Sequence, residues 1–439
     1  MTSLAERVAG LALSTFESLP RKCKPRTFAD GGREWTPMAA LILAEAGDDR
    51  PLTCVSLATG TKCLAASALP TCRGTVLHDC HAEILALRGF NWWLLAEVQK
   101  IVEDPAYQSP FLESEKEYET DHQQTTLSTP LSTPGAPFRL KPTISIHFFT
   151  TEAPCGDASM EILMNSLPPD EAAPWPVREN ASTALQGRGH FSLLGHVRRK
   201  PARADAEPSL SKSCTDKLAL KQFTGIISFP ADLFVQRTAN AFIRTVVVYA
   251  NQYNSTGYER AFASSGRLSS LSHLGHFFSI ESLPPEFSRF PFSKDDRSVD
   301  SRTQTRLKAS NLSALWVNRP GQKKDDVLEV LVNGVKQGYK QWDERPAKAS
   351  VASRRRLWEH GVKIAKIFPQ NQGSRGEPDD RIEYDVEWHK KIDQVLSIKT
   401  YCAAKSTTLR SSYVQRKKHV TEALCNWTDN RGDDEWSLC

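Results

Sequence analysis

The sequence has no pattern of a disulfide framework or a membrane span, and we expect its first residues to form a packed helix and not a secretion signal. Its 10 cysteines are scattered over 439 residues, too sparsely for a disulfide scaffold, so reduced thiols are expected. No apolar run reaches the roughly 18 residues that mark a membrane span, and the chain does not open with a charged segment followed by an apolar block. We therefore expect a protein of the nucleus and/or cytoplasm that has no membrane partner.

A strong charge bias is also absent. The formal net charge is +5 and the pI is about 8.6, while hydrophobic residues make up 40% and charged residues 24% of the chain. These values are typical of a globular protein, and a mild basic excess permits a nucleic-acid partner without requiring one. No obligate protein partner is evident.

The chain alternates strand-like and helix-like patterns. The segments that alternate as strands do are 52–58, 143–149, 243–250 and 326–334. A helix of about six turns is predicted to follow Asp79, and residues 385–424 have a helical and basic pattern. This order predicts an α/β fold built in layers.

One stretch interrupts this alternation. Residues 113–137 are polar and rich in Ser, Thr and Pro. Such a composition does not bury enough apolar surface to fold by itself. The sequence therefore predicts a disordered insertion over 111–140 within a single domain.

Two short motifs carry groups that bind metals or move protons. His81 and Glu83 stand at the expected start of one helix, and Pro-Cys-Gly at 154–156 directly follows a strand. A His-x-Glu triplet is expected roughly 0.7 times by chance at this composition, whereas Pro-Cys-Gly is expected about 0.03 times. A helix N-terminus lowers the pKa of a thiol, so Cys155 is expected to be poised as the thiolate that binds zinc.

The position of Glu83 favours proton transfer over metal binding. Two residues along a helix turn it about 200° away from His81, but in the first turn Glu83 can reach a metal-bound water. Zinc nucleobase deaminases combine His-x-Glu with Pro-Cys-x-x-Cys. Here Ala158 stands where the second cysteine is expected. Either the site is broken or a third ligand comes from elsewhere.

Four ordered segments resemble the RNA adenosine deaminases that act on tRNA and on double-stranded RNA. They are "ATGTKC" (58–63), "DCHAEI" (79–84), "APCGDA" (153–158) and "SCTDKLALKQ" (213–222). In that family the third zinc ligand is a distant cysteine in a Ser-Cys-Ser-Asp-Lys segment. The resemblance covers most of the chain and implies one zinc on His81, Cys155 and Cys214, with Glu83 as the proton shuttle. It implies a layered deaminase fold with a central mixed β-sheet flanked by helices, in one catalytic domain over 1–439.

Within the family, the chain resembles the tRNA-specific members, because too little sequence precedes Thr59 for separate RNA-binding domains. Similarity to the fungal type implies hydrolytic deamination to inosine of the adenosine 3′ of the anticodon, position 37, in alanine tRNA. Two alternatives remain open. A deaminase of a free nucleoside or another RNA would share the zinc and the glutamate, and a zinc-bearing RNA-binding protein without activity would not need Glu83.

A basic run lies just before the Cys214 segment. Its members are Arg198, Arg199, Lys200 and Arg203. Their closeness in sequence to an expected metal ligand favours contact with RNA phosphates, and the alternative is a solvated charge run. We therefore expect an RNA-binding loop here.

The resemblance also implies a second cofactor. The double-stranded RNA editors enclose inositol hexakisphosphate behind the zinc site, and the matching positions here are Lys62, Arg88, Lys217, Tyr401, Lys405, Tyr413, Lys417 and Trp427. Leu87 and Leu220 replace arginines of those editors. The family likeness implies that Asp79 and Lys217 link the zinc-bound water to the polyphosphate by hydrogen bonds. We expect one buried polyphosphate, enclosed by the largely helical C-terminal part.

Overall fold

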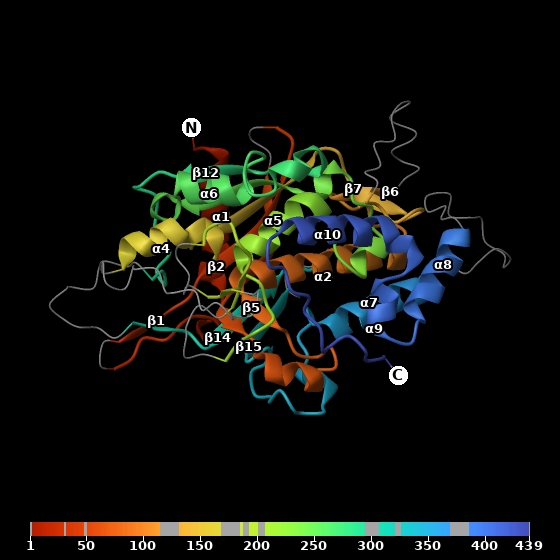
Figure 1. Ribbon diagram of the computed structural model, residues 1–439. Coiled ribbons are helices and arrows are strands. Elements are labelled where there is room, and N and C mark those ends of the chain that lie inside the picture. The colour runs from red at the N-terminus through yellow and green to blue at the C-terminus, as the bar shows by residue number, and fades with distance from the viewer. Residues whose placement is uncertain are drawn as a thin grey trace.

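A mixed sheet of eight strands lies at the centre of the protein (Figure 1). The computed structural model describes residues 2–29, 32–47, 51–114, 131–167, 185–187, 193–200, 207–294, 307–320, 326–368 and 386–438. Across the sheet the strands are β12 (Ser279–Leu283), β11 (Ile243–Tyr249), β8 (Ile144–Thr150), β2 (Met38–Glu45), β3 (Leu52–Thr59), β14 (Leu312–Val317), β15 (Val327–Val332) and β16 (Val335–Lys336). The first three are parallel and the other neighbours antiparallel, which confirms the predicted mixed α/β sheet.

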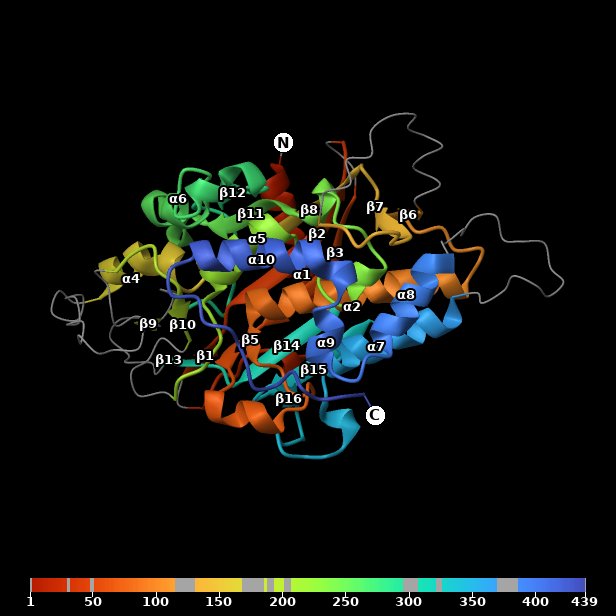
Figure 2. The ribbon, with the colours of Figure 1, turned by 45° about the vertical axis from the view of Figure 1, so that its right-hand side comes forward.

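Helices cover both faces of this sheet. They are α1 (Leu4–Ser18), α2 (Ala82–Glu103), α4 (Met160–Ser166), α5 (Cys214–Thr224), α6 (Ser255–Phe262), α7 (Arg354–Ile367), α8 (Val386–Leu396), α9 (Tyr401–Lys405) and α10 (Ser411–Ala423). Figure 2 shows α10 lying over α5, with α7 beside α2 and α8 beside α7. None of the described helices is long and apolar enough to cross a membrane.

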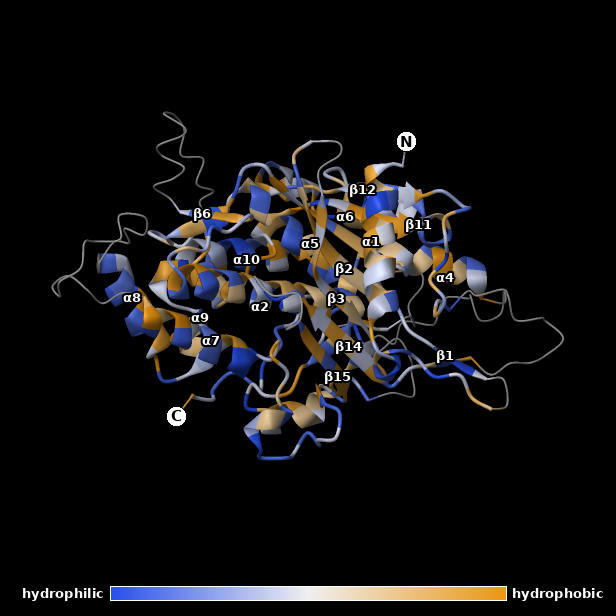
Figure 3. Cartoon of the chain, turned by 180° about the vertical axis from the view of Figure 1, so that it is seen from behind, coloured by the Kyte–Doolittle hydropathy of each residue, from blue (hydrophilic) through white to orange (hydrophobic). Residues whose placement is uncertain are grey.

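Strand β2 shows why the sheet is buried on both sides. Successive side chains of a strand point to opposite faces, so Leu41 and Leu43 join the core beneath α2, while Ala40 and Ile42 join the core beneath α1. A strand covered on both faces is apolar throughout, as "MAALILAE" is. Figure 3 shows hydrophobic residues concentrated in these strands.

Both flanks of the predicted insertion belong to the folded domain. Residues 112–114 and 138–140 pair as β6 (Leu112–Ser114) and β7 (Phe138–Leu140). Phe138 is buried in the main core, and the Trp388 side chain lies against Gly135. The limits 111 and 140 were therefore wrong, because these flanks bury apolar side chains. Residues 115–130 lie outside the described residues.

Candidate active site

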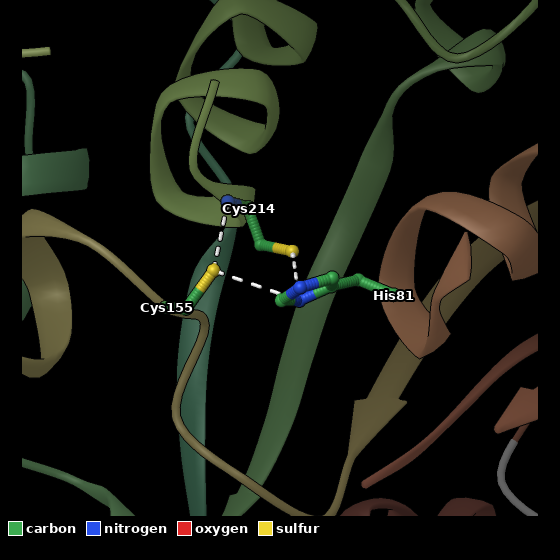
Figure 4. A group of neighbouring side chains, drawn as sticks. All are labelled: His81, Cys155 and Cys214. Carbon is green, nitrogen blue, oxygen red and sulfur yellow. Dashed lines mark hydrogen bonds between the residues drawn. The ribbon is translucent and has the colours of Figure 1, made fainter. Parts of the chain in front are cut away.

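Three side chains that are far apart in the sequence point toward one another (Figure 4). His81 ends β5 (Asp79–His81) and precedes α2, Cys155 lies in the loop after β8, and Cys214 is the first residue of α5. The His81 Nδ1 atom lies 3.7 Å from the Sγ atom of each cysteine. The three ligand atoms lie within 4.8 Å of one another. The structure thus brings together the residues that the sequence singled out as metal ligands.

Close backbone packing holds the two cysteines side by side. Gly156 has a φ of +113°, and a Cβ on it would lie 2.2 Å from Ser213 Oγ, so only glycine fits after Cys155. Ser213 caps α5 by accepting a hydrogen bond from the backbone of Asp216. The Thr215 hydroxyl donates to the Pro154 carbonyl over 2.9 Å. The Pro-Cys-Gly turn is therefore fastened to the start of α5.

The donor set fits zinc. Sulfur and nitrogen ligands of one tetrahedral zinc ion lie roughly 3.6 Å apart, given bonds of about 2.3 and 2.05 Å. The 3.7 Å distances from His81 Nδ1 to the two sulfurs match this value. A hydrogen bond from Cys214 lowers the pKa of the Cys155 thiol well below its usual value, which favours the thiolate. One imidazole and two thiolates would be the set of three protein ligands that is typical of a catalytic zinc site.

Glu83 lies in the first turn of α2 and is 3% exposed. Its Oε2 atom is buried and has no hydrogen-bond partner among the described residues. Burial, together with the nearby Cys155, raises the pKa of the Glu83 carboxyl. A carboxyl group with a raised pKa and a free oxygen is suited to accepting and returning a proton.

Lys200 belongs to this site and not to an RNA-binding surface. Its side chain is 4% exposed, and its Nζ atom lies 2.8 Å from Asp79 Oδ2 and 3.3 Å from Cys214 Sγ. Lys217 pairs with the same carboxylate, which also accepts a 2.7 Å hydrogen bond from Ser211. The prediction of RNA contact was wrong for Lys200, because a buried carboxylate and a thiol take up its charge. Sequence reasoning missed this role.

The prediction of RNA contact was also wrong for Arg198. It is 2% exposed, and its guanidinium donates to the carbonyls of Gly187 and Leu193. A buried side chain that donates to the backbone does not present its charge to phosphates, so Arg198 is structural. Arg199 is partly exposed and stays a prediction, and Arg203 lies outside the described residues.

Basic side chains from α2, α5, α7, α9, α10 and the segments between them gather near this site. This basic cluster comprises Arg88, Arg237, Arg354, Arg410, Lys212, Lys217, Lys221, Lys405 and Lys417, with Tyr401 and Tyr413 among them. The carboxylates described near it include Asp79, Asp232, Asp429 and Asp433, which are fewer than its nine basic side chains. The described cluster therefore has an excess of positive charge.

The pKa values in the cluster reflect this excess. Burial and repulsion from Lys417 lower the pKa of Lys405 well below its usual value. Burial and Lys217 lower the pKa of Lys212 to about 7. Burial alone would raise the pKa of Tyr413, but Lys221 and other nearby cations lower it to about 8. Each shift marks buried charge that an anion would relieve.

The structure places the predicted polyphosphate contacts unequally. Arg88, Tyr401, Lys405, Tyr413 and Lys417 lie in the basic cluster. Lys217 pairs with Asp79 and lies near Lys212 of this cluster, and its link to a polyphosphate stays a prediction.

Two further contacts lie at the margin of the cluster. The Trp427 ring packs under the Lys212 ammonium, 5.2 Å away. Lys62 lies on β4 (Thr61–Cys63), opposite Cys80, and stays a prediction.

Sequence reasoning missed several members of the cluster: Arg237, Arg354, Arg410, Lys212 and Lys221. Lys221 lies inside the "SCTDKLALKQ" segment and Lys212 directly before it, whereas no quoted motif includes the three arginines. The signal that was available is the basic pattern of the C-terminal region, which does not separate buried from exposed charges.

A layered α/β domain that sets a His-Cys-Cys donor group beside a buried glutamate defines a deaminase. Residues 56–430 match the adenosine-deaminase (editase) domain, and the chain belongs to this family of enzymes.

The relatives include proteins named for two kinds of RNA. The chain is 33% identical to tRNA-specific adenosine deaminase 1 of Schizosaccharomyces pombe, over 99% of this chain and 97% of that protein. It is 28% identical to tRNA-specific adenosine deaminase 1 of Saccharomyces cerevisiae, over 90% of each chain. The double-stranded RNA-specific adenosine deaminase of Mus musculus is 28% identical over 40% of this chain and 13% of its own length.

Proposed function

We propose that this enzyme is a zinc-dependent deaminase that converts adenosine in tRNA to inosine. The observation that supports this most directly is the Glu83 carboxyl, buried beside the His81, Cys155 and Cys214 donor group. A structural zinc site would have no use for such a group, because it closes its fourth position with another ligand. The reaction is hydrolytic: adenosine and water give inosine and ammonia.

Glu83 is the group that moves protons in this proposal. His81, Cys155 and Cys214 would hold the zinc, which would supply the Lewis acidity that makes water acidic enough to give up a proton. The Glu83 carboxylate takes one proton from the attacking water, delivers it to N1 of adenine, and later helps to protonate the departing ammonia. Lys200 and Asp79 orient the Cys214 thiolate through the contacts described above.

The substrate is proposed from the extent of the similarity. The chain aligns with 97% of a tRNA-specific relative but with only 13% of a double-stranded RNA-specific one. We infer that position 37, 3′ of the anticodon of alanine tRNA, is the target, and that loop bases flip at low energetic cost. Arg199 and Arg203 are proposed to contact phosphates. The enzyme would then act as one catalytic domain, in the nucleus and/or cytoplasm.

The basic cluster is proposed to hold one inositol hexakisphosphate. Lys405 and Lys417 repel each other in a region where the described carboxylates are too few to balance the charge. A compact anion with many phosphates fits this excess, because charge-assisted hydrogen bonds to phosphate replace repulsion. The ligand would be structural, since it lies behind the metal-ligand group and binds only the folded protein.

Inosine mapping on total tRNA tests the proposed reaction. We expect inosine at position 37 of alanine tRNA, with free adenosine and a long perfect duplex as much poorer substrates. Equal rates on the duplex would contradict the tRNA assignment, and an inactive protein that retains zinc would contradict the reaction.

Acid extraction tests the cofactor separately. Mass spectrometry of the extract is expected to find about one inositol hexakisphosphate per chain. An active preparation without any inositol polyphosphate would remove this cofactor.

A further inference from the structure

Each cysteine of the metal-ligand group is followed two residues later by a buried aspartate. Asp157 follows Cys155 and Asp216 follows Cys214, and both aspartates are 0% exposed. A carboxylate at this depth is costly unless a cation and hydrogen-bond donors surround it. Both aspartates therefore need specific partners, and the structure gives each of them the same two kinds.

The first kind of partner is an arginine from α6 or from the turn that follows it. Arg260 Nε lies 3.0 Å from Asp157 Oδ2, and Arg267 Nη1 lies 2.6 Å from Asp216 Oδ1. The backbone amide of Arg267 donates to the carbonyl of Arg260 over 2.9 Å. The two ion pairs are therefore held next to each other by one short piece of chain.

The second kind of partner is a backbone amide, and both amides belong to the same short segment. Asp157 Oδ1 accepts a 2.7 Å hydrogen bond from the Gly195 amide, and Asp216 Oδ2 accepts a 2.9 Å hydrogen bond from the Arg198 amide. The carbonyl of Arg198 accepts a further 2.8 Å hydrogen bond from the Ser213 amide. The segment is thus fastened to the start of α5 on both sides of Arg198.

This segment carries Lys200, two residues beyond Arg198. The Lys200 Nζ atom lies 3.3 Å from Cys214 Sγ. Asp216 Oδ2 also accepts a 2.6 Å hydrogen bond from the hydroxyl of Ser213, which directly precedes Cys214. One carboxylate therefore fixes both the turn that presents the sulfur and the segment that brings a cation to it.

We propose that Asp157 and Asp216 are positioning residues for the metal-ligand group. They hold the segment that places Lys200, whose ammonium stabilises the Cys214 thiolate by a charge-assisted hydrogen bond. Groups that orient metal ligands in this way change metal affinity about 10-fold to 100-fold. The inference rests on the proposed zinc-dependent function, because its effect is an effect on zinc binding.

Zinc affinity, measured by competition with a chelator, tests the two aspartates. Asp216→Asn keeps the shape of the side chain but removes the charge that pairs with Arg267, so the affinity should fall about 10-fold to 100-fold, and Asp157→Asn should lower it too. Glu113→Gln is the matched control, because its largely buried ion pair with Arg139 joins β6 to β7 and should not affect zinc. Unchanged affinity in folded Asp216→Asn, or an equal fall in Glu113→Gln, would overturn the proposal. Unchanged affinity in folded Asp157→Asn would remove that residue from it.

A double-mutant cycle with Lys200→Met separates positioning from a general weakening of the fold. Two residues that act on one contact do not have additive effects. Asp216→Asn should therefore lower zinc affinity much less when Lys200 has already been replaced. A double variant whose affinity falls by the product of the two single effects would overturn the route through Lys200.

Cobalt(II) bound in place of zinc gives a measurement that needs no enzyme activity. Its visible absorption bands depend on the arrangement of its ligands, so they should shift in Asp216→Asn and stay unchanged in Glu113→Gln. Arg267→Lys keeps the charge of the ion pair but not its geometry, and it gives the same test should Asp216→Asn fail to fold. Unmodified protein that binds neither metal would contradict the proposed function. Normal metal binding with unshifted bands in the folded variants would contradict this inference alone.

Discussion

The metal-ligand group and the basic cluster are neighbours, and they have opposite electrostatic character. His81, Cys155 and Cys214 present electron pairs that attract a cation. The basic cluster presents ammonium and guanidinium groups that attract an anion and, in its absence, repel one another. Lys217 pairs with Asp79 at the boundary, so one ion pair joins the two regions.

The difference shows how strongly each region depends on its ligand. The metal-ligand group is small, and turns and a helix cap hold it in place. The basic cluster buries lysine side chains whose pKa values are lowered. Burying these cations opposes folding until an anion binds. A missing metal would therefore abolish chemistry, whereas a missing polyanion would weaken the fold.

The largest expected effect is a loss of catalysis without loss of zinc or of the polyphosphate. Glu83→Gln should retain zinc and the polyphosphate but lose about 10²-fold to 10⁴-fold in kcat, because one proton shuttle is removed. Glu103→Gln, at the other end of α2, is the matched control and should keep its activity. Inosine formation in single-turnover assays measures the loss. A Glu83→Gln enzyme of normal rate would assign the proton transfer to another group.

The boundary between the regions is tested by Lys200→Met. This change removes the charge that joins Cys214 to Asp79, so zinc affinity should fall about 10-fold to 100-fold, as it does when groups that orient metal ligands are lost. Competition with a chelator measures the affinity. Arg199→Met changes the adjacent basic residue and should leave zinc affinity unchanged while raising KM for tRNA. Equal zinc affinities in Lys200→Met and the unmodified protein would restrict Lys200 to a packing role.

Short motifs explain why the metal-ligand group could be predicted. His81 and Cys155 each stand in a local pattern that also fixes a turn or a helix start. The third ligand needed the family resemblance, because nothing near Cys214 alone distinguishes a ligand from a buried thiol. The strands at 52–58 and 143–149 followed from simple alternation, and β3 and β8 confirm them.

The basic run could not be interpreted in the same way. Lys200 meets Asp79 across 121 residues of sequence, so its pattern is the same whether the charge is solvated or buried. Arg354 and Arg410 likewise acquire their neighbours only when α7 and α10 pack against the rest of the fold. Tertiary packing decides which cations of a basic chain lie inside, and local sequence does not record it.

Lys405→Met tests whether the basic cluster binds an anion, because its effect on the free energy of unfolding should have opposite signs with and without the anion. With a polyanion bound, the change removes a contact to charged groups and should lower the free energy of unfolding by about 1.5–3 kcal/mol. In protein refolded without polyphosphate, the same change removes buried repulsion from Lys417 and should raise it. Lys418→Met is the matched control, since that exposed lysine on α10 should change neither value. Destabilisation of the same size in both preparations would show that Lys405 does not bind an anion.

The smallest expected effect is a pH dependence of the free energy of unfolding, which should appear only when no anion is bound in the basic cluster. Lys212 has a pKa of about 7 and Tyr413 of about 8, whereas the same groups of the unfolded chain have ordinary values of 10.5 and 10.0. Between pH 7 and 10 the unfolded chain therefore binds more protons than the empty folded protein, so the free energy of unfolding rises with pH. A bound polyanion keeps Lys212 protonated and flattens this rise. Urea unfolding at pH 7 and 9 measures both slopes, and parallel slopes with and without polyphosphate would mean that the anion does not reach these groups.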